Sequence, residues 1–179
     1  MPRVTLWRHG KIDGVVNCLS APAKNGSFET KSWDDFLTHL NVQLKAAVEI
    51  ESHAVSFMKK QGGGRLLHIV TSYVIGVPPS GLSDYIAAKY ALLGLTKALA
   101  RELGKYQITV NAVSPGFIKN RFTAHVPEKF ADILVSSVPL GALTTENDVA
   151  SAVAFLLSDE ASWVTGQTWC VDGGTVLKI

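Results

Sequence analysis

The sequence predicts an α/β fold in which helices cover both faces of a parallel sheet. Four short apolar runs, at 12–16, 65–71, 107–113 and 167–171, have the length and composition of buried strands. Helix-length stretches separate these runs, which is the order expected of β-α-β units. The chain has 179 residues, of which 47 % are hydrophobic and 18 % charged, enough for one globular domain with a sizeable core.

The first long helix is placed by its cap and by the glycines that follow it. Ser32 is a good N-cap, and Asp34 and Asp35 follow it, so a helix is predicted over about 32–60. Three glycines at 62–64 then end the helix. A phosphate cradle needs glycines between a strand and a helix N-terminus, whereas these follow a helix and precede a strand. We therefore predict a turn at these glycines rather than a nucleotide site.

The rest of the chain contains two more predicted helices. The first, at about 84–103, is rich in Ala and Leu, with Gly104 as its C′ residue. Residues 118–140 are expected to be irregular, with short helical pieces. The last helix, 146–157, has apolar residues at helical spacing. We find no repeat and no linker, so residues 1–179 are expected to form a single domain.

Composition excludes several classes of function. Lys plus Arg is 17 and Asp plus Glu 15, a net charge of +2, which argues against nucleic acid or an anionic membrane as partner. There is no apolar run of the roughly 18 residues that a membrane span needs, and no secretory signal. Cys18 and Cys170 are expected to be reduced, buried thiols of a cytoplasmic protein. The five histidines show no metal-ligand spacing, so no metal is predicted.

The residues that carry chemistry are Ser72, Tyr85 and Lys89. Tyr85 and Lys89 are four apart and therefore lie on one face of a helix. An ammonium near a phenol favours the phenolate, so a tyrosine that normally titrates near ~10 becomes a usable acid or base. A serine hydroxyl beside it can hold a carbonyl oxygen while a proton is passed. These three side chains are the catalytic groups expected of a carbonyl–alcohol oxidoreductase.

In this order along the chain, these residues resemble the short-chain dehydrogenase/reductase family. The stretch SDYIAAKYALLGLTKALARELGKYQITVNAVSPGF is similar to its active-site helix, the following strand and a Pro-Gly turn. LSDEASWVTGQTWCVDGG resembles its C-terminal segment, and GKIDGVVNCLS its Asn-Asn-Ala-Gly strand. The tail is most similar to 3-oxoacyl-acyl-carrier-protein reductases and to sugar or steroid dehydrogenases.

The resemblance runs from about residue 8 to the end and implies a partial fold. It begins at the family's fourth strand, so it implies the C-terminal part of a Rossmann-like doubly wound parallel sheet, about four strands with helices on both faces. The first three strands are absent, and with them the glycine fingerprint of the nucleotide site. In the strand order 3-2-1-4-5-6, this leaves the strand at 12–16 as a bare edge.

The resemblance assigns a role to each catalytic candidate. Tyr85 would be the general acid in reduction and the base in oxidation. Lys89 would lower the pKa of Tyr85 and hydrogen-bond the nicotinamide ribose. Ser72 would position the substrate oxygen. Asn41 falls where the family has a helix asparagine that holds a water in the proton relay.

A second group of residues would face the cofactor, NADP or NAD. Asn17 begins the turn that is Asn-Asn-Ala-Gly in the family and reads Asn-Cys-Leu-Ser here. Pro115 and Gly116 match the turn that backs the nicotinamide, and the backbone of Ile118 would contact its amide. Asn120 stands where a threonine often binds the cofactor. Tyr85 and Lys89 belong to this group as well.

Three hypotheses about function remain open at this stage. The first is an NAD(P)-dependent oxidoreductase that interconverts a small ketone and a secondary alcohol, present as an incomplete chain. The second is a non-catalytic subunit that pairs with a full-length relative, since family oligomers, dimers or tetramers, pair through the two long helices. The third is a fragment whose first residues, MPRVTLW, are a false start.

Overall fold

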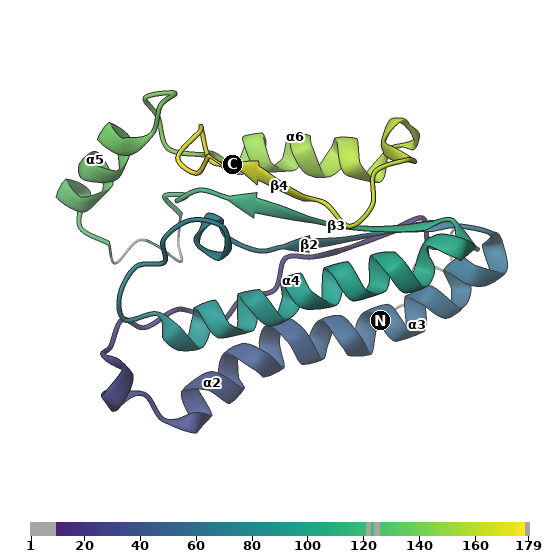
Figure 1. The fold of residues 1–179 in the computed structure, drawn as a ribbon, viewed down its shortest axis with the longest axis horizontal. Coiled ribbons are helices and arrows are strands. Elements are labelled where there is room, and N and C mark those ends of the chain that lie inside the picture. Colours follow the sequence, from purple (N-terminus) through teal and green to yellow (C-terminus); the bar gives the residue numbers. More distant parts are fainter. Residues whose placement is uncertain (1–9, 121–122, 124–125, 178–179) are drawn as a thin grey trace.

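The predicted sheet is present, and its four parallel strands lie side by side in the order in which they occur in the chain (Figure 1). The computed structural model describes residues 10–120, 123 and 126–177. The start of the family resemblance, at about residue 8, lies outside these residues. The strands are β1 (Gly14–Asn17), β2 (Gly64–Ile69), β3 (Ile108–Pro115) and β4 (Thr168–Val171). Each lies within about two residues of its predicted run, so the parallel α/β class is confirmed.

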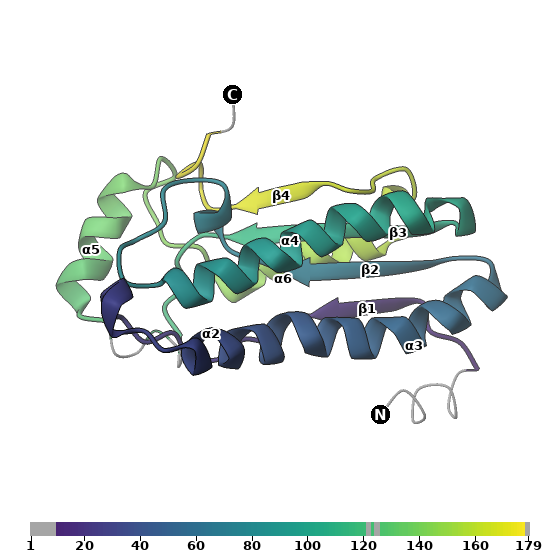
Figure 2. The same cartoon turned by 60° about the horizontal axis from the view of Figure 1, so that its bottom comes forward.

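One face of the sheet is covered by the two long helical segments (Figure 2). The first consists of α2 (Trp33–Leu40), a π-helical turn (Asn41–Lys45) and α3 (Ala46–Gln61), and matches the predicted helix at 32–60. The second is α4 (Ser83–Leu103). Ser32 caps α2 as predicted, because its hydroxyl accepts from the Asp35 N–H while the Asp35 carboxylate accepts from the Ser32 N–H.

The opposite face is covered by α6 (Glu146–Leu157), which is the predicted last helix (Figure 1). Thr145 and Asp148 form a second capping box at its start. A further helix, α5 (Glu128–Ser137), lies in the stretch predicted to contain short helical pieces. Helices on both faces are therefore confirmed, and β1 is an edge strand among the described residues.

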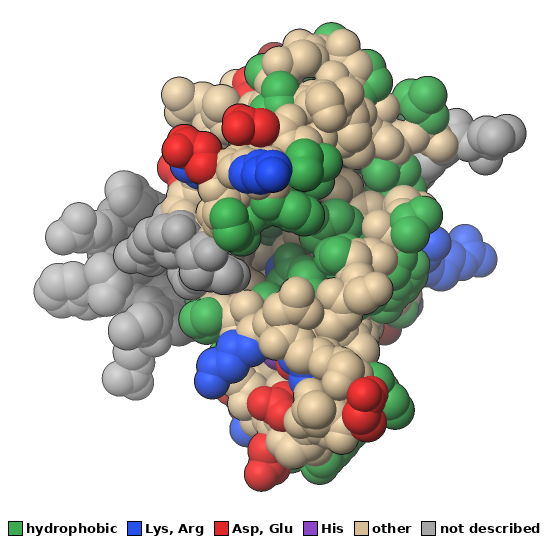
Figure 3. All heavy atoms as spheres, turned by 90° about the vertical axis from the view of Figure 1, so that its left-hand side faces the viewer, with side chains coloured by type: hydrophobic (Ala, Val, Ile, Leu, Met, Phe, Trp, Pro, Cys, Tyr) green, Lys and Arg blue, Asp and Glu red, His purple; other side chains and the backbone are tan. Residues whose placement is uncertain are grey.

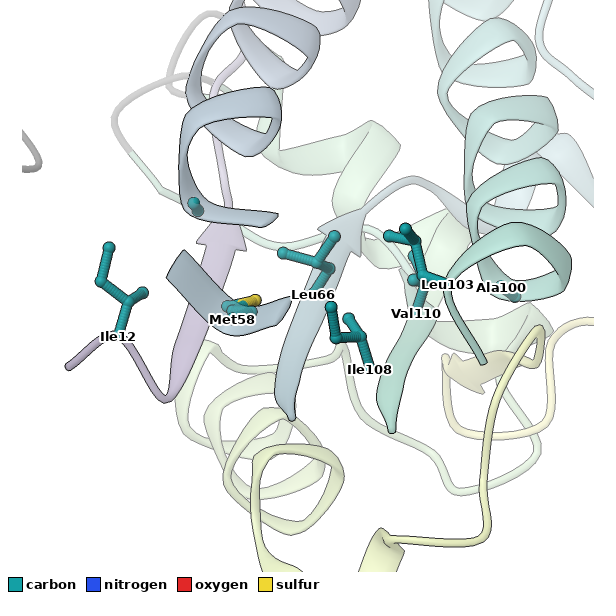
Figure 4. Packing of buried hydrophobic residues seen from close by; sticks show 8 residues of the cluster. Ile12, Met58, Leu66, Ala100, Leu103, Ile108 and Val110 are labelled. Carbon is teal, nitrogen blue, oxygen red and sulfur yellow. The ribbon is translucent and has the colours of Figure 1, made fainter. Parts of the chain in front are cut away.

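The core between the sheet and its first helical face is apolar and closely packed (Figure 4). Met58 of α3 is fully buried, and a Cβ on Gly64 would come within 2.4 Å of its sulfur, so only glycine fits where β2 begins. Gly62, with φ of 88°, caps α3 in the left-handed conformation. The glycines at 62–64 therefore make the predicted turn. The buried cluster consists of Ile12, Ala54, Met58, Leu66, Ala100, Leu103, Ile108 and Val110.

Two local predictions are wrong. Gly104 is not a left-handed C′ residue: its φ is −54°, and the chain continues through a 3-10 turn to Gln107, which is left-handed at φ 59°. The turn delays the reversal by three residues. Cys18 is exposed rather than buried because it follows the last residue of the edge strand, whereas Cys170 is partly buried; neither forms a disulfide.

Within residues 10–120, 123 and 126–177, no helix is long and apolar enough to cross a membrane. The same residues contain no group of three or more His, Cys, Asp or Glu side chains placed to hold a metal ion.

Candidate active site

The predicted site residues gather where the strands end. The carboxyl ends of all four parallel strands lie at the same edge of the sheet, and α4 starts there (Figure 1). Figure 3 shows this end of the molecule: hydrophobic side chains surround a hollow, and charged side chains lie above and below it. Ligands of open α/β sheets bind at this edge.

Tyr85 approaches the end of β2 at Thr71, the residue directly before Ser72. Ser72 is 4 % exposed and opens a short 3-10 turn directly after β2. Tyr85 is half-buried in the first turn of α4. The Thr71 hydroxyl hydrogen-bonds the Tyr85 side chain, which ties the end of β2 to the start of α4. Sequence reasoning missed Thr71, whose only signal is its place directly before Ser72.

Lys89 lies one turn further along α4, with its side chain buried behind Tyr85. Its Nζ donates to the Ile69 carbonyl at 2.8 Å and lies 5.7 Å from the centre of the Tyr85 ring. Burial lowers the pKa of Lys89 to about 8. Tyr85 and Lys89 therefore lie close together against the end of β2, where Ser72 follows Thr71 in the chain.

The pKa of Tyr85, however, moves in the direction opposite to the expected one. Burial raises the pKa of Tyr85 to about 12, although the hydrogen bond with Thr71 lowers it. The expected lowering by Lys89 does not appear, because that ammonium is itself buried and its nearest partner is the Ile69 carbonyl rather than the phenol. The phenol is thus protonated at neutral pH.

Asn17 is placed as the resemblance implies, but Asn41 is not brought to the cluster. Asn17, at the end of β1, is 6 % exposed and its Nδ2 donates to the backbone carbonyl of Gln43 at 3.2 Å. Asn41 lies two residues earlier with an exposed side chain. Gln43, in contrast, is fully buried. No observation tests the role given to Asn41, which stays a prediction.

Asn41 and Gln43 both lie in the π-helical turn that joins α2 to α3. It spans Asn41–Lys45 and inserts one extra residue between α2 and α3, which shifts the register of the following turn. Such turns occur mostly at functional sites. The sequence signal that could have indicated Gln43 is a lone amide flanked by Val42 and Leu44, but a π-turn has no reliable sequence signature.

Pro115 and Gly116 form the turn at the end of β3. The Gly116 N–H donates to the Val171 carbonyl at 2.9 Å, which joins this turn to β4. A Cβ on Gly116 would lie 2.7 Å from the Thr144 hydroxyl and 3.1 Å from the Cα of Asp172, so the backbone approach requires glycine.

Ile118 and Asn120 lie further along this connection. The Ile118 carbonyl accepts from the Thr123 hydroxyl at 2.7 Å. The Asn120 N–H donates to the same hydroxyl at 2.8 Å, and its side chain reaches Glu146 at the start of α6. The structure thus gives both residues a place at the predicted edge and leaves their contact with a cofactor untested.

A buried polar cluster behind Tyr85 was not expected from the sequence. Asp84 is 2 % exposed, and the Lys31 ammonium donates to its Oδ2 at 2.9 Å. Burial alone would raise the pKa of Asp84, but Lys31 and the Tyr85 backbone N–H outweigh it and hold the pKa low. His39 is 3 % exposed, with its Nε2 3.7 Å from Asp84 Oδ2. Asp84 is far in sequence from Lys31 and His39, which left no pattern to detect.

Comparison with known proteins identifies the family. A family profile described as enoyl-(acyl carrier protein) reductase matches residues 4–176. The 3-oxoacyl-[acyl-carrier-protein] reductase FabG of Thermotoga maritima is 36 % identical over 95 % of this chain. That of Rickettsia felis is 41 % identical over 80 % of this chain. A 3α-hydroxysteroid dehydrogenase of Mediterraneibacter gnavus is 38 % identical over 92 % of this chain.

A solved structure shows that the likeness extends to the fold. Levodione reductase superposes with a TM-score of 0.90 over 97 % of this chain, at 29 % identity. This chain spans 68 % of the length of the Thermotoga protein, 59 % of the Rickettsia protein and 70 % of the levodione reductase chain. The expectation of a match to only part of a longer fold is therefore confirmed.

Proposed function

This chain belongs to the short-chain dehydrogenase/reductase family, and we propose from that premise that it is an NAD(P)-dependent oxidoreductase interconverting a ketone and a secondary alcohol. The observation that supports the proposal is that Tyr85 and Lys89 of α4 lie against the end of β2, directly before Ser72, at the carboxyl edge of the sheet. A relative that reduces 3-oxoacyl groups and one that acts on a hydroxysteroid share this chemistry of a carbonyl and a secondary alcohol.

The nicotinamide end of the cofactor fits the residues present at this edge. A phenol from Tyr85 and an ammonium from Lys89 are donors suited to ribose hydroxyls. The turn at Pro115 and Gly116, with Ile118 and Asn120 beyond it, would hold the nicotinamide, and Asn17 would border it from β1. When bound, the cofactor supplies or takes up the hydride at the carbonyl carbon. The sequence holds no G-x-G-x-x-G fingerprint for its adenosine end.

The proton is moved by the chain's own residues. In reduction, the Ser72 hydroxyl donates a hydrogen bond to the carbonyl oxygen, which polarises the carbonyl. Tyr85 then gives its phenolic proton to that oxygen as it becomes an alcohol. Burial raises the pKa of Tyr85 to about 12, so the phenol carries the proton that this step requires at neutral pH. Gln43 is a better candidate than Asn41 for the place of the relay asparagine, because Gln43 is buried beside Asn17.

The test is cofactor binding and turnover by the 179-residue chain. We would titrate NADH and NADPH while following tryptophan fluorescence, and then assay reduction of a panel of ketones by loss of absorbance of the reduced cofactor. Tyr85→Phe is expected to abolish turnover while leaving the fold intact, and Ser72→Ala to lower kcat. Binding of neither cofactor, with no turnover also after an N-terminal extension to the length of the relatives, would contradict the proposal.

A second candidate function is a non-catalytic subunit that pairs with a copy of itself or a longer relative. The observation that favours it is the exposed apolar side chains on the outer surfaces of the two long helices. Val48 and Ile50 are 47 % and 45 % exposed on α3, and Tyr90 is 49 % exposed on α4. Light scattering that gives the mass of a monomer at all concentrations, alone and with a relative added, would exclude this candidate. We also propose that the protein is located in the cytoplasm.

A further inference from the structure

The buried cluster behind Tyr85 contains a histidine whose ring touches the tyrosine. His39, in the last turn of α2, packs edge-on against the Tyr85 ring, with ring centres 5.7 Å apart and planes at 77°. This contact joins α2 to α4. An edge-to-face pair of this kind fixes the relative orientation of two rings.

The imidazole of His39 is itself held from both sides. Gln43 Nε2 lies 3.2 Å from His39 Nδ1, and His39 Nε2 faces Asp84 Oδ2 at 3.7 Å. In this orientation of the Gln43 amide, its Nε2 donates to Nδ1, which then carries no proton, and Gln43 Oε1 is left buried without a partner among the described residues. With the amide so placed, a neutral ring carries its proton on Nε2, the nitrogen that faces the carboxylate at 3.7 Å, beyond hydrogen-bond distance. Burial also disfavours the charged ring and lowers the pKa of His39.

Asp84 connects His39 to the backbone of Tyr85. Its Oδ1 accepts from the Tyr85 N–H at 2.9 Å, and its Oδ2 accepts from Lys31 at 2.9 Å. One carboxylate thus orients both the backbone of Tyr85 and the histidine that packs on the Tyr85 ring. Lys31 neutralises the charge of this carboxylate, which offsets the free-energy cost of burying the group.

We propose that His39 is a positioning residue for Tyr85: its neutral imidazole, locked between the Gln43 amide and the Asp84 carboxylate, holds the tyrosine ring where it meets the substrate. The inference rests on the proposed function only in taking Tyr85 as the proton donor. His39 does not touch the reacting atoms and acts through Tyr85.

The primary test measures where Tyr85 lies, through the ionisation of its phenol. The protein is labelled with 13C at the tyrosine ring carbon bearing the hydroxyl, and the Tyr85 signal is assigned with Tyr85→Phe. At pH 11, a phenol with a pKa of about 12 is roughly one tenth ionised. His39→Phe keeps a ring but removes both polar contacts, so Tyr85 is expected to turn toward water and become roughly nine tenths ionised, as an ordinary phenol of pKa ~10 is.

Two further variants separate positioning from general stability. His39→Gln retains hydrogen-bonding groups and is expected to keep Tyr85 mostly protonated at pH 11. His53→Phe, at an exposed histidine of α3, makes the same chemical change away from the site and should leave the Tyr85 signal unchanged. Unchanged ionisation of Tyr85 in a folded His39→Phe protein would overturn the proposal, because His39 would then only fill space.

A second measurement serves if His39→Phe does not fold at pH 11. In the parent protein at pH 7, 15N spectra of the imidazole should show the neutral ring protonated at Nε2. A ring protonated at Nδ1, or an imidazolium, would overturn the proposed arrangement of His39 between Gln43 and Asp84. Neither measurement uses cofactor or substrate. A lack of turnover would therefore count against the proposed function alone. An unmoved Tyr85 in an active enzyme would count against this inference alone.

Discussion

Lys89 gives the sharpest prediction because its charge is buried in the folded chain. The side chain is 3 % exposed and burial lowers its pKa to about 8, against an ordinary value of 10.5. The unfolded chain therefore binds more protons than the folded chain between pH 8 and 10.5. Stability rises with pH wherever the unfolded state binds more protons, so Lys89 makes the protein more stable as the pH rises through this window.

The size of the effect follows from the two pKa values. At pH 7.5 the lysine is protonated in the unfolded chain and largely so in the folded one, where its charge is costly. At pH 10 the folded chain has lost that proton. Integrating between these limits for pKa values of about 8 and 10.5 gives an increase in the free energy of unfolding of about 2 kcal/mol. Lys89→Met is expected to remove this increase.

The measurement is urea denaturation at pH 7.5 and pH 10, followed by far-UV circular dichroism. Ionisation of tyrosines and other lysines affects parent and variant alike, so the difference between the two proteins isolates Lys89. Lys97→Met, at an exposed position of the same helix, is the matched control and should behave as the parent. If Lys89→Met keeps the full increase, or if the parent loses stability between these pH values, then the reasoning about the buried ammonium is wrong.

Three further predictions concern the fold. Glu51 Oε1 lies 2.8 Å from Nε2 of the fully buried His68, so Glu51→Ala should lower the free energy of unfolding by about 1–3 kcal/mol. Glu51→Gln retains an acceptor oxygen and should cost less; equal losses in urea titrations would refute this. Met58→Ala opens a cavity in the core and should cost about 2–5 kcal/mol by the same measurement, and a loss under 1 kcal/mol would contradict the packing described. Gly116→Ala places a methyl group 2.7 Å from the Thr144 hydroxyl. The NMR signals of the backbone amides in this turn should therefore shift, while those of α3 stay in place. Unmoved signals in the turn would mean that it has room for the methyl group.

The parts of the fold that the sequence predicts best are those with a local physical cause. Ser32 and its capping partner Asp35 mark the start of α2, and Gly62 marks the end of α3, because a cap depends on residues three or four apart. The end of α4 at residue 103 was also predicted, but the C′ role given to Gly104 was wrong, because the chain continues from there into a 3-10 turn. Helix ends that tighten in this way depend on the next strand as much as on their own residues.

The site was predictable where a motif spans one helix and unpredictable where it crosses between elements. Tyr85 and Lys89 lie one turn apart, so their common face follows from spacing alone. The pKa of Tyr85 did not follow, because burial by surrounding elements outweighs the charge of its neighbour. Gln43 and His39 were missed because a π-turn and a tertiary contact place them, and neither leaves a period in the sequence.

The position of α6 has a consequence for how this molecule folds. The strands follow one another across the sheet in a single direction, with α3 and α4 on one face and α6 on the other. The crossover through α6 therefore has the opposite hand to the two before it, and nearly all such connections are right-handed. Strand twist does not favour this hand, so α6 depends on contacts of Leu156 with Leu67 and Val113, which exist only in a finished sheet. We expect α6 to dock late, and the long connection that leads to it carries the turn at Gly116, so the cofactor-facing edge is completed only in that last step.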